Sequence, residues 1–117
     1  MQTQEYQIIE TGSKVITDNQ WDFLEASYVK FYNKKIVTLR YNRRTAMNVP
    51  NGTNQIYSSG SFTSAYIPPY PVRAVYDKFQ LQIMDTGIIN TINTTGSAIN
   101  NQTPNFTVTY IVHNANV

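Results

Sequence analysis

Apolar and polar residues alternate in short runs along most of the chain, and two of these runs are long and regular. One run covers residues 27–33 and the other covers residues 36–41. Because successive side chains of a strand point to opposite faces, a period of two predicts half-buried β-strands. Asn33 and Lys34 separate the runs and are typical of a turn, so the pattern predicts a β-hairpin.

A second hairpin is predicted nearer the carboxyl end, where residues 79–83 and 88–92 flank the turn Asp85-Thr86-Gly87. Residues 21–24 fit either an aromatic bend or one helical turn. Pro68, Pro69 and Pro71 cannot donate to a strand ladder, so they predict a strand end at an edge or corner. The remaining expected strands cover residues 5–10 with a continuation at 14–17, then 56–57, 61–66, 72–75 and 106–112. Most of 44–60 and all of 94–104 are predicted to be loops.

About eight short strands with frequent turns predict an all-β fold, either a small antiparallel sandwich or a jelly-roll (Greek-key) barrel. The composition agrees, because the chain is rich in Asn, Thr and Tyr and poor in helix formers. Its 117 residues predict a single domain, 1–117. The expected core consists of alternating apolar residues: Trp21, Val29, Phe31, Val37, Leu39, Phe62, Phe79, Leu81, Ile83, Ile89, Val108, Tyr110 and Val112.

The charge balance excludes several function classes. The net charge is +2 and only 14% of residues are charged, so no nucleic-acid partner is predicted. One basic cluster stands out, and it predicts either a solvated hairpin end or a phosphate-binding surface; it comprises Lys34, Lys35, Arg40, Arg43 and Arg44. No signal-peptide pattern and no apolar run of ~18 residues occur, so we expect a soluble chain without membrane insertion.

The chemistry of the side chains gives no catalytic motif. The chain has no cysteine and one histidine, and it contains no phosphate loop, so no metal and no cofactor are predicted. A glycosidase needs two carboxylates about 5–9.5 Å apart, and no spacing favours such a pair. The candidate carboxylates are Asp22, Glu25, Asp77 and Asp85. We predict a protein that is not an enzyme, with hydrolysis as an open alternative through Ser, Asp and His113.

Seven pieces of the chain, in order, carry a resemblance to a known family. They are Trp21 after a polar turn, the Lys-Ile-Val-Thr-Leu run at 35–39, a polar loop at 51–60, a proline/arginine element at 67–73, the strand 79–83, Asp85-Thr86-Gly87-Ile88, and the Phe-Thr-Val-Thr-Tyr-Ile-Val run at 106–112. This order resembles the receptor-binding head of lactococcal-type siphophages, the carboxyl-terminal domain of a baseplate or tail protein.

The resemblance implies a small β-barrel or jelly roll that forms a homotrimer with other baseplate proteins at the tail tip of the virion. It also implies non-catalytic binding of a host cell-wall polysaccharide or glycerol-phosphate polymer at the bacterial surface. Residues 1–18 would then be the connection from an upstream neck or shoulder. The alternative is a structural baseplate or tail subunit without its own receptor site.

The resemblance also implies site residues. In lactococcal heads, the strand after the proline/arginine element carries polar ligands, among them a histidine and an aspartate. Gln80 and Gln82 occupy the matching positions here, and their amides can still hold sugar hydroxyls. Trp21 and Tyr76 are candidates for stacking on a sugar ring, as are Tyr66 and Tyr70. Asp85 and His113 complete the expected saccharide site; for Trp21 core or interface packing is the alternative, and for His113 an exposed or interface position.

Overall fold

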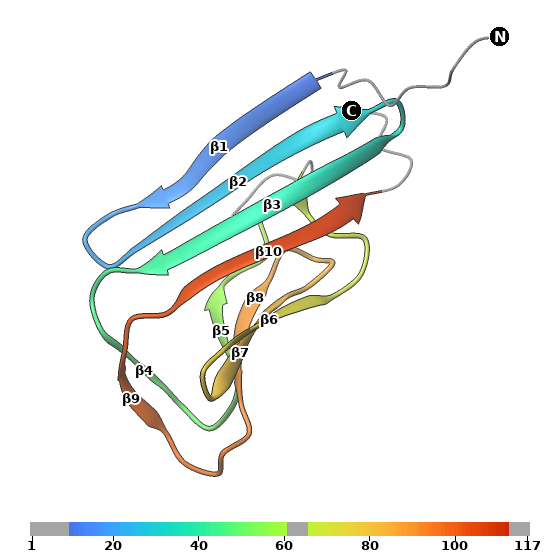
Figure 1. The fold of residues 1–117 in the computed structure, drawn as a ribbon. Helices are drawn as coiled ribbons and strands as arrows, with labels where there is room; N and C mark the ends of the chain where they lie inside the picture. The colour runs from blue at the N-terminus through green and yellow to red at the C-terminus, as the bar shows by residue number, and fades with distance from the viewer. Residues whose placement is uncertain (1–9, 61–65, 113–117) are drawn as a thin grey trace, which may run out of the picture.

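The computed structural model describes residues 10–60 and 66–112, and ten β-strands account for most of this part of the chain (Figure 1). Their bounds are β1 Glu10–Asp18, β2 Asp22–Phe31, β3 Lys34–Arg43, β4 Met47–Val49, β5 Gly52–Tyr57, β6 Val72–Tyr76, β7 Phe79–Ile83, β8 Ile89–Asn93, β9 Ile99–Gln102 and β10 Asn105–Val112.

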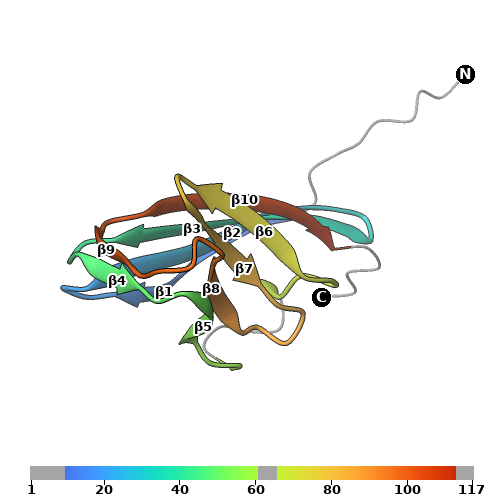
Figure 2. The same cartoon turned by 90° about the horizontal axis from the view of Figure 1, so that it is seen from below.

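The strands form two antiparallel four-stranded sheets and a short two-stranded ribbon. The first sheet has the order β1-β2-β3-β10 and the second has the order β5-β8-β7-β6. The ribbon pairs β4 with β9 at one end of the molecule (Figure 2). The expected all-β sandwich is therefore confirmed, with ten strands in place of about eight.

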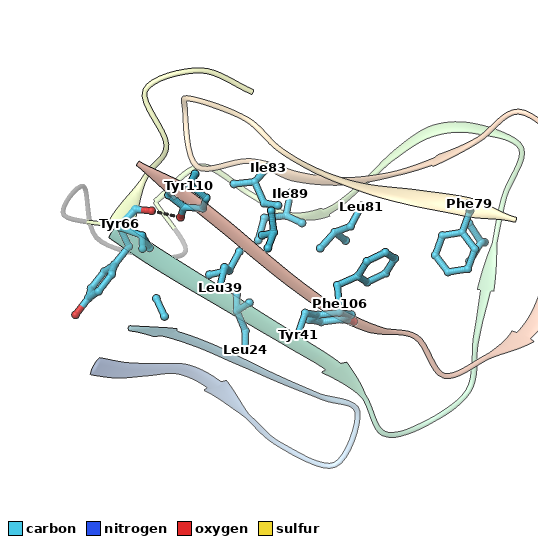
Figure 3. Close-up of a cluster of buried hydrophobic side chains, with 14 residues drawn as sticks. Leu24, Leu39, Tyr41, Tyr66, Phe79, Leu81, Ile83, Ile89, Phe106 and Tyr110 are labelled. Atoms are coloured by element: carbon cyan, nitrogen blue, oxygen red, sulfur yellow. Dashed lines mark hydrogen bonds between the residues drawn. The ribbon is translucent and has the colours of Figure 1, made fainter. Parts of the chain in front are cut away.

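The core fills the space between the two sheets (Figure 3). Two polar contacts also tie the first sheet to other parts of the fold. The Tyr110 hydroxyl, on the first sheet, donates to the backbone carbonyl of Tyr66, and the Tyr57 hydroxyl, on the second sheet, donates to Asp22 Oδ2 at 2.8 Å. The buried apolar side chains are Leu24, Ala26, Val37, Leu39, Tyr41, Val49, Tyr66, Phe79, Leu81, Ile83, Ile89, Phe106, Val108 and Tyr110.

The prediction of which β2 residues point into the core was wrong. Val29 and Phe31 point to the outer face, whereas Leu24 and Ala26 are fully buried. The cause is the parity of the hairpin: its two-residue turn pairs Phe31 with Lys34 and Val29 with Ile36. Directly opposed residues share a face of the sheet, so Val29 cannot lie on the same side as Val37.

Other expected core residues divide by position. Phe79, Leu81, Ile83, Ile89, Val37, Leu39, Val108 and Tyr110 are buried as predicted, and Val112 packs at the core margin. Trp21 is 51% exposed, which corrects its placement in the core. It lies in the turn between β1 and β2, where its carbonyl accepts hydrogen bonds from the Arg44 and Thr45 amides. Phe62 lies outside the described residues.

Three strands lie within segments predicted to be largely loop. Residues 44–60 contain β4 and β5, and residues 94–104 contain β9. β4 has only three residues, and β5 and β9 are mostly polar, so a hydrophobic alternation could not mark them. The predicted strand at 5–10 falls outside the described residues except for Glu10, and that at 61–66 except for Tyr66. Residues 14–17 belong to β1, and most of 21–24 belongs to β2.

An edge glycine fixes how β1 meets β2. Gly12 pairs with Tyr28, and the Tyr28 ring lies across the glycine backbone. A Cβ at position 12 would stand 2.4 Å from Tyr28 Cε1, so only glycine fits beneath the ring. The Tyr28 hydroxyl donates to Glu10, which holds the ring in place on this edge strand.

Candidate functional site

The outer face of the second sheet carries a row of polar side chains that crosses all four strands. Gln55 on β5 pairs with Asn90 on β8, Asn90 pairs with Gln82 on β7, and Gln82 pairs with Arg73 on β6. Directly opposed side chains stand about 5 Å apart, so the row is about 14 Å long. It consists of three carboxamides and one guanidinium.

A parallel row lies beside it and is more apolar. Gln80 pairs with Ile92 on one side and with Val75 on the other, and Ile92 pairs with Thr53. Val75 is 72% exposed. We call the two rows together the amide face; its residues are Thr53, Gln55, Arg73, Val75, Gln80, Gln82, Asn90 and Ile92.

The polar groups of the amide face make few hydrogen bonds within the protein. Asn90 Nδ2 donates to Gln82 Oε1 at 3.3 Å, and Arg73 Nη1 donates to Gln80 Oε1 at 3.3 Å. Both contacts are long, and each carboxamide offers two donors and an acceptor in all. The face can therefore exchange hydrogen bonds with the hydroxyl groups of a ligand, while Val75 offers an apolar contact.

Arg73 is the one charged residue of the amide face. The other three arginines lie on β3 or just after it, and each is within salt-bridge distance of a carboxylate: Arg40 of Glu25, Arg43 of Asp22 and Arg44 of Asp18. Arg73 contacts a neutral amide instead. Because the face carries no carboxylate, it has positive character and presents only donors and neutral acceptors.

The structure brings together two of the predicted site residues and separates the others. Gln80 and Gln82 lie on β7 with their side chains on the same outer face. Tyr76 points to the other side of the sheet, where its ring packs 5.8 Å from Phe79 and 5.7 Å from Phe106. Its place in the aromatic cluster means that it cannot stack on a ligand at the amide face.

Neither Asp85 nor Trp21 lies on a strand of this face. Asp85 is exposed in the turn between β7 and β8, which closes through Met84 and Ile88. Trp21 lies on the first sheet's β1–β2 turn. His113 lies outside the described residues. Of the other stacking candidates, Tyr66 is buried, whereas Tyr70 is 53% exposed two residues before β6.

The candidate carboxylates have structural partners or stand far apart. Asp22 Oδ2 accepts hydrogen bonds from Tyr57 and, at 3.2 Å, from Tyr41. Burial, reinforced by the Asp22 charge, raises the pKa of Tyr41 to about 12. Asp77 and Asp85 lie in the turns beyond opposite ends of β7, whose five residues alone span about 13 Å, which is more than the spacing that glycosidases use.

The basic cluster seen in the sequence is divided by the fold. Lys34 and Lys35 begin β3 and the three arginines lie at its far end. Lys35 is buried, with its ammonium 4.6 Å from the Tyr28 ring centroid, and burial together with the nearby Lys30 charge lowers its pKa. The cluster is therefore neither a solvated hairpin end as a whole nor one continuous phosphate surface.

Three residues of the amide face were not predicted as site residues from the sequence: Gln55, Arg73 and Asn90. Asn90 had a usable signal, because the predicted hairpin of residues 79–83 and 88–92 already placed it near Gln82. Arg73 had a weaker signal, namely its place in the alternating pattern of β6. Gln55 had none, since only residues 56–57 of β5 were predicted to be strand.

The chain matches no protein-family model, no curated protein and no solved structure. The resemblance to receptor-binding heads therefore stays a prediction that rests on the order of the motifs. No helix long and apolar enough to span a membrane occurs within the described residues.

Proposed function

We propose that this chain is a phage baseplate or tail adhesion module that binds host cell-wall saccharide, without catalysis, through the amide face. The observation that carries the proposal is the cross-strand row Gln55–Asn90–Gln82–Arg73, with Gln80 beside it. The order of the sequence motifs supports the same conclusion, because it points to Gln80 and Gln82 independently of the fold.

The chemistry of the row suits a polyhydroxylated ligand. Carboxamides donate and accept at once, which matches the donor and acceptor character of each sugar hydroxyl. Arg73 can add a charge-assisted contact to a phosphate or carboxylate on the polymer. A shallow face of this kind binds weakly, so many copies on one virion would supply avidity. The homotrimer and the contacts with other baseplate proteins stay predictions from the resemblance.

The test is binding of the fluorescently labelled protein to a panel of Gram-positive cells, with and without free wall polysaccharide. We expect strain-selective binding that the polysaccharide abolishes. Gln80→Ala/Gln82→Ala should lose this binding. Asn100→Ala/Gln102→Ala is the matched control, because it removes two carboxamides from β9 and leaves the amide face intact. Equal binding by both double variants would refute the site.

A structural baseplate or tail subunit is the second candidate. It is favoured by the absence of any aromatic side chain from the amide face, since aromatic stacking supports many saccharide sites. Such a subunit would ignore cells of every strain and would instead assemble with purified tail proteins. Release of soluble saccharide from purified cell walls would point to an enzyme and overturn both proposals.

A further inference from the structure

The outer face of the first sheet has an unusual order of side chains. One row across its four strands is Thr11–Val29–Ile36–Ile111, in which three of the four residues are aliphatic. The next row is Ser13–Ser27–Thr38–Thr109, in which every residue carries a hydroxyl. Neither row contains a charge. We call these two rows together the aliphatic face.

This face is exposed and incompletely filled by its own side chains. Ile36 is 37% exposed and Ile111 is 40% exposed. A hollow of about 540 Å³ lies over the middle of the face, and a second of about 280 Å³ lies between Phe31, Lys34, Ile36 and Ile111. Exposed aliphatic residues gathered on one flat face are typical of an interaction surface.

We infer that a second copy of the chain packs on the aliphatic face around a two-fold axis. The axis lies in the interface between the two packed sheets, parallel to the strands and midway between β2 and β3. Such an axis places β2 of one copy over β3 of the other at the same level. Ser27 then faces Thr38 of the second copy, and Val29 faces Ile36. The aliphatic row meets the aliphatic row, and the hydroxyl row meets the hydroxyl row.

The charges beside the aliphatic face match under the same axis. Glu25 pairs with Arg40 within one chain, with a contact of 3.4 Å between Oε1 and Nη2. The axis puts Glu25 over Arg40 of the second copy and Arg40 over Glu25. The two copies therefore form a cluster of alternating charges. Other two-fold arrangements would set like charges or unlike rows against each other.

The available area is sufficient for a specific dimer. Four strands span about 19 Å with their side chains, and five rows from Phe31–Lys34 to Phe23–Asn42 span about 30 Å. The whole outer face of the first sheet, which includes the aliphatic face, thus offers roughly 600 Å² per copy, or about 1,200 Å² in total, which is the lower end of the range for specific interfaces. We expect micromolar affinity, and aligned sheet packing of this kind is common.

This inference does not rest on the proposed function, because the amide face lies on the other sheet and stays open in the dimer. It does differ from the homotrimer that the resemblance implies. The same measurement decides between them: sedimentation equilibrium of the full chain across micromolar concentrations. A dimer supports the inference, whereas a trimer or a monomer throughout this range overturns it.

Two single substitutions test the face itself. Ile36→Lys places a charge opposite Val29 of the second copy and should weaken the dimer more than about 100-fold. Val75→Lys is the matched control, since it adds the same charge to an exposed β-branched position on the opposite sheet, and the dimer should persist. A wild-type circular-dichroism spectrum and a cooperative thermal transition would establish that each variant folds, because loss of the dimer by itself lowers the thermal midpoint. A dimer that survives Ile36→Lys would overturn the inference.

A mixing experiment tests the axis. Glu25→Arg gives a face with two arginines and Arg40→Glu gives one with two carboxylates, so each variant alone should be monomeric. Mixed in equal amounts, they should form a heterodimer, because every facing pair is then opposite in charge. Failure of the mixture to dimerise, with both variants folded and the wild type dimeric, would refute this two-fold arrangement.

Discussion

Asn93 is the side chain whose replacement we expect to cost most stability among the polar residues. It is fully buried on β8, facing the ribbon of β4 and β9. Its Nδ2 donates to the Val49 carbonyl at 3.0 Å and to the Ser97 carbonyl at 2.9 Å. Its Oδ1 accepts from Thr95 N at 3.0 Å and from Thr95 Oγ1 at 2.7 Å. The donor and acceptor groups of the side-chain amide therefore all have hydrogen-bond partners, and the amide links β8 to β4.

The expected cost follows from these four contacts. Each hydrogen bond contributes about 0.5–1.5 kcal/mol net, so Asn93→Ala should cost about 2–6 kcal/mol. Thr95 and Ser97 are exposed and regain water, which favours the middle of that range, about 3–4 kcal/mol. An unfolding entropy of about 2.1 cal/mol/K per residue converts this to a fall in Tm of roughly 12–16 °C.

Asn93→Asp sharpens the test because it adds a charge at the same place. The carboxylate faces two carbonyl oxygens without donating, and burial would raise its pKa above the unfolded value of about 3.9. The folded state then binds more protons than the unfolded state, so stability should fall as pH rises above about 4. The variant should therefore be less stable at pH 7 than at pH 4, relative to wild type.

The assay is urea unfolding followed by circular dichroism, with Asn90→Ala as the control. Asn90 lies on the same strand but on the outer face, and it makes one long hydrogen bond to Gln82. Its removal should cost less than about 1 kcal/mol. If Asn93→Ala cost no more than Asn90→Ala, the structural role assigned to the buried amide would be wrong.

Three further outcomes are expected. Gly12→Ala should destabilise the fold by about 1–3 kcal/mol in urea unfolding, because the added methyl overlaps the Tyr28 ring; a stabilised variant would mean that the ring moves away. Burial raises the pKa of Tyr41 to about 12 and also raises that of Tyr57, so the unfolded state loses protons first and stability should fall as pH rises from about 10 towards 12; urea midpoints that stay constant over this interval would contradict it. Trp21 is the only tryptophan and is half exposed, so native emission should be red-shifted and readily quenched by acrylamide, whereas a blue-shifted, protected emission would place it in the core after all.

Much of the fold was predictable because the long strands alternate clearly. The β2–β3 and β7–β8 hairpins follow from alternation and turn residues, and both are present. The face of β2 was mispredicted because Val29 and Phe31 are more apolar than Ala26, while the hairpin parity, which was not applied, decides the matter. β4, β5 and β9 were missed in part or in full, since β4 is only three residues long and the mostly polar β5 and β9 have no hydrophobic period.

The residues of the candidate site were also predictable only in part. Gln80 and Gln82 were named because they occupy the positions that the resemblance assigns to polar ligands, and their alternation with buried residues puts both on the outer face of one strand. Tyr76 was misplaced, since a residue next to a turn can point to either face until the pairing register is known. Gln55 joins the row only because β5 pairs with β8, a contact between segments more than thirty residues apart in the sequence.

The strand class, the β2–β3 and β7–β8 hairpins and most of the buried positions of β3, β7 and β10 were predictable from the sequence, because these depend on local alternation and turn chemistry. The tertiary structure alone decided which strands share a sheet, which face of β2 is inward, and where the amides, arginines and exposed aliphatic residues gather. The physical reason is that register and sheet order depend on hydrogen bonds between distant segments, and a shift of one residue moves every side chain of a strand to the other face.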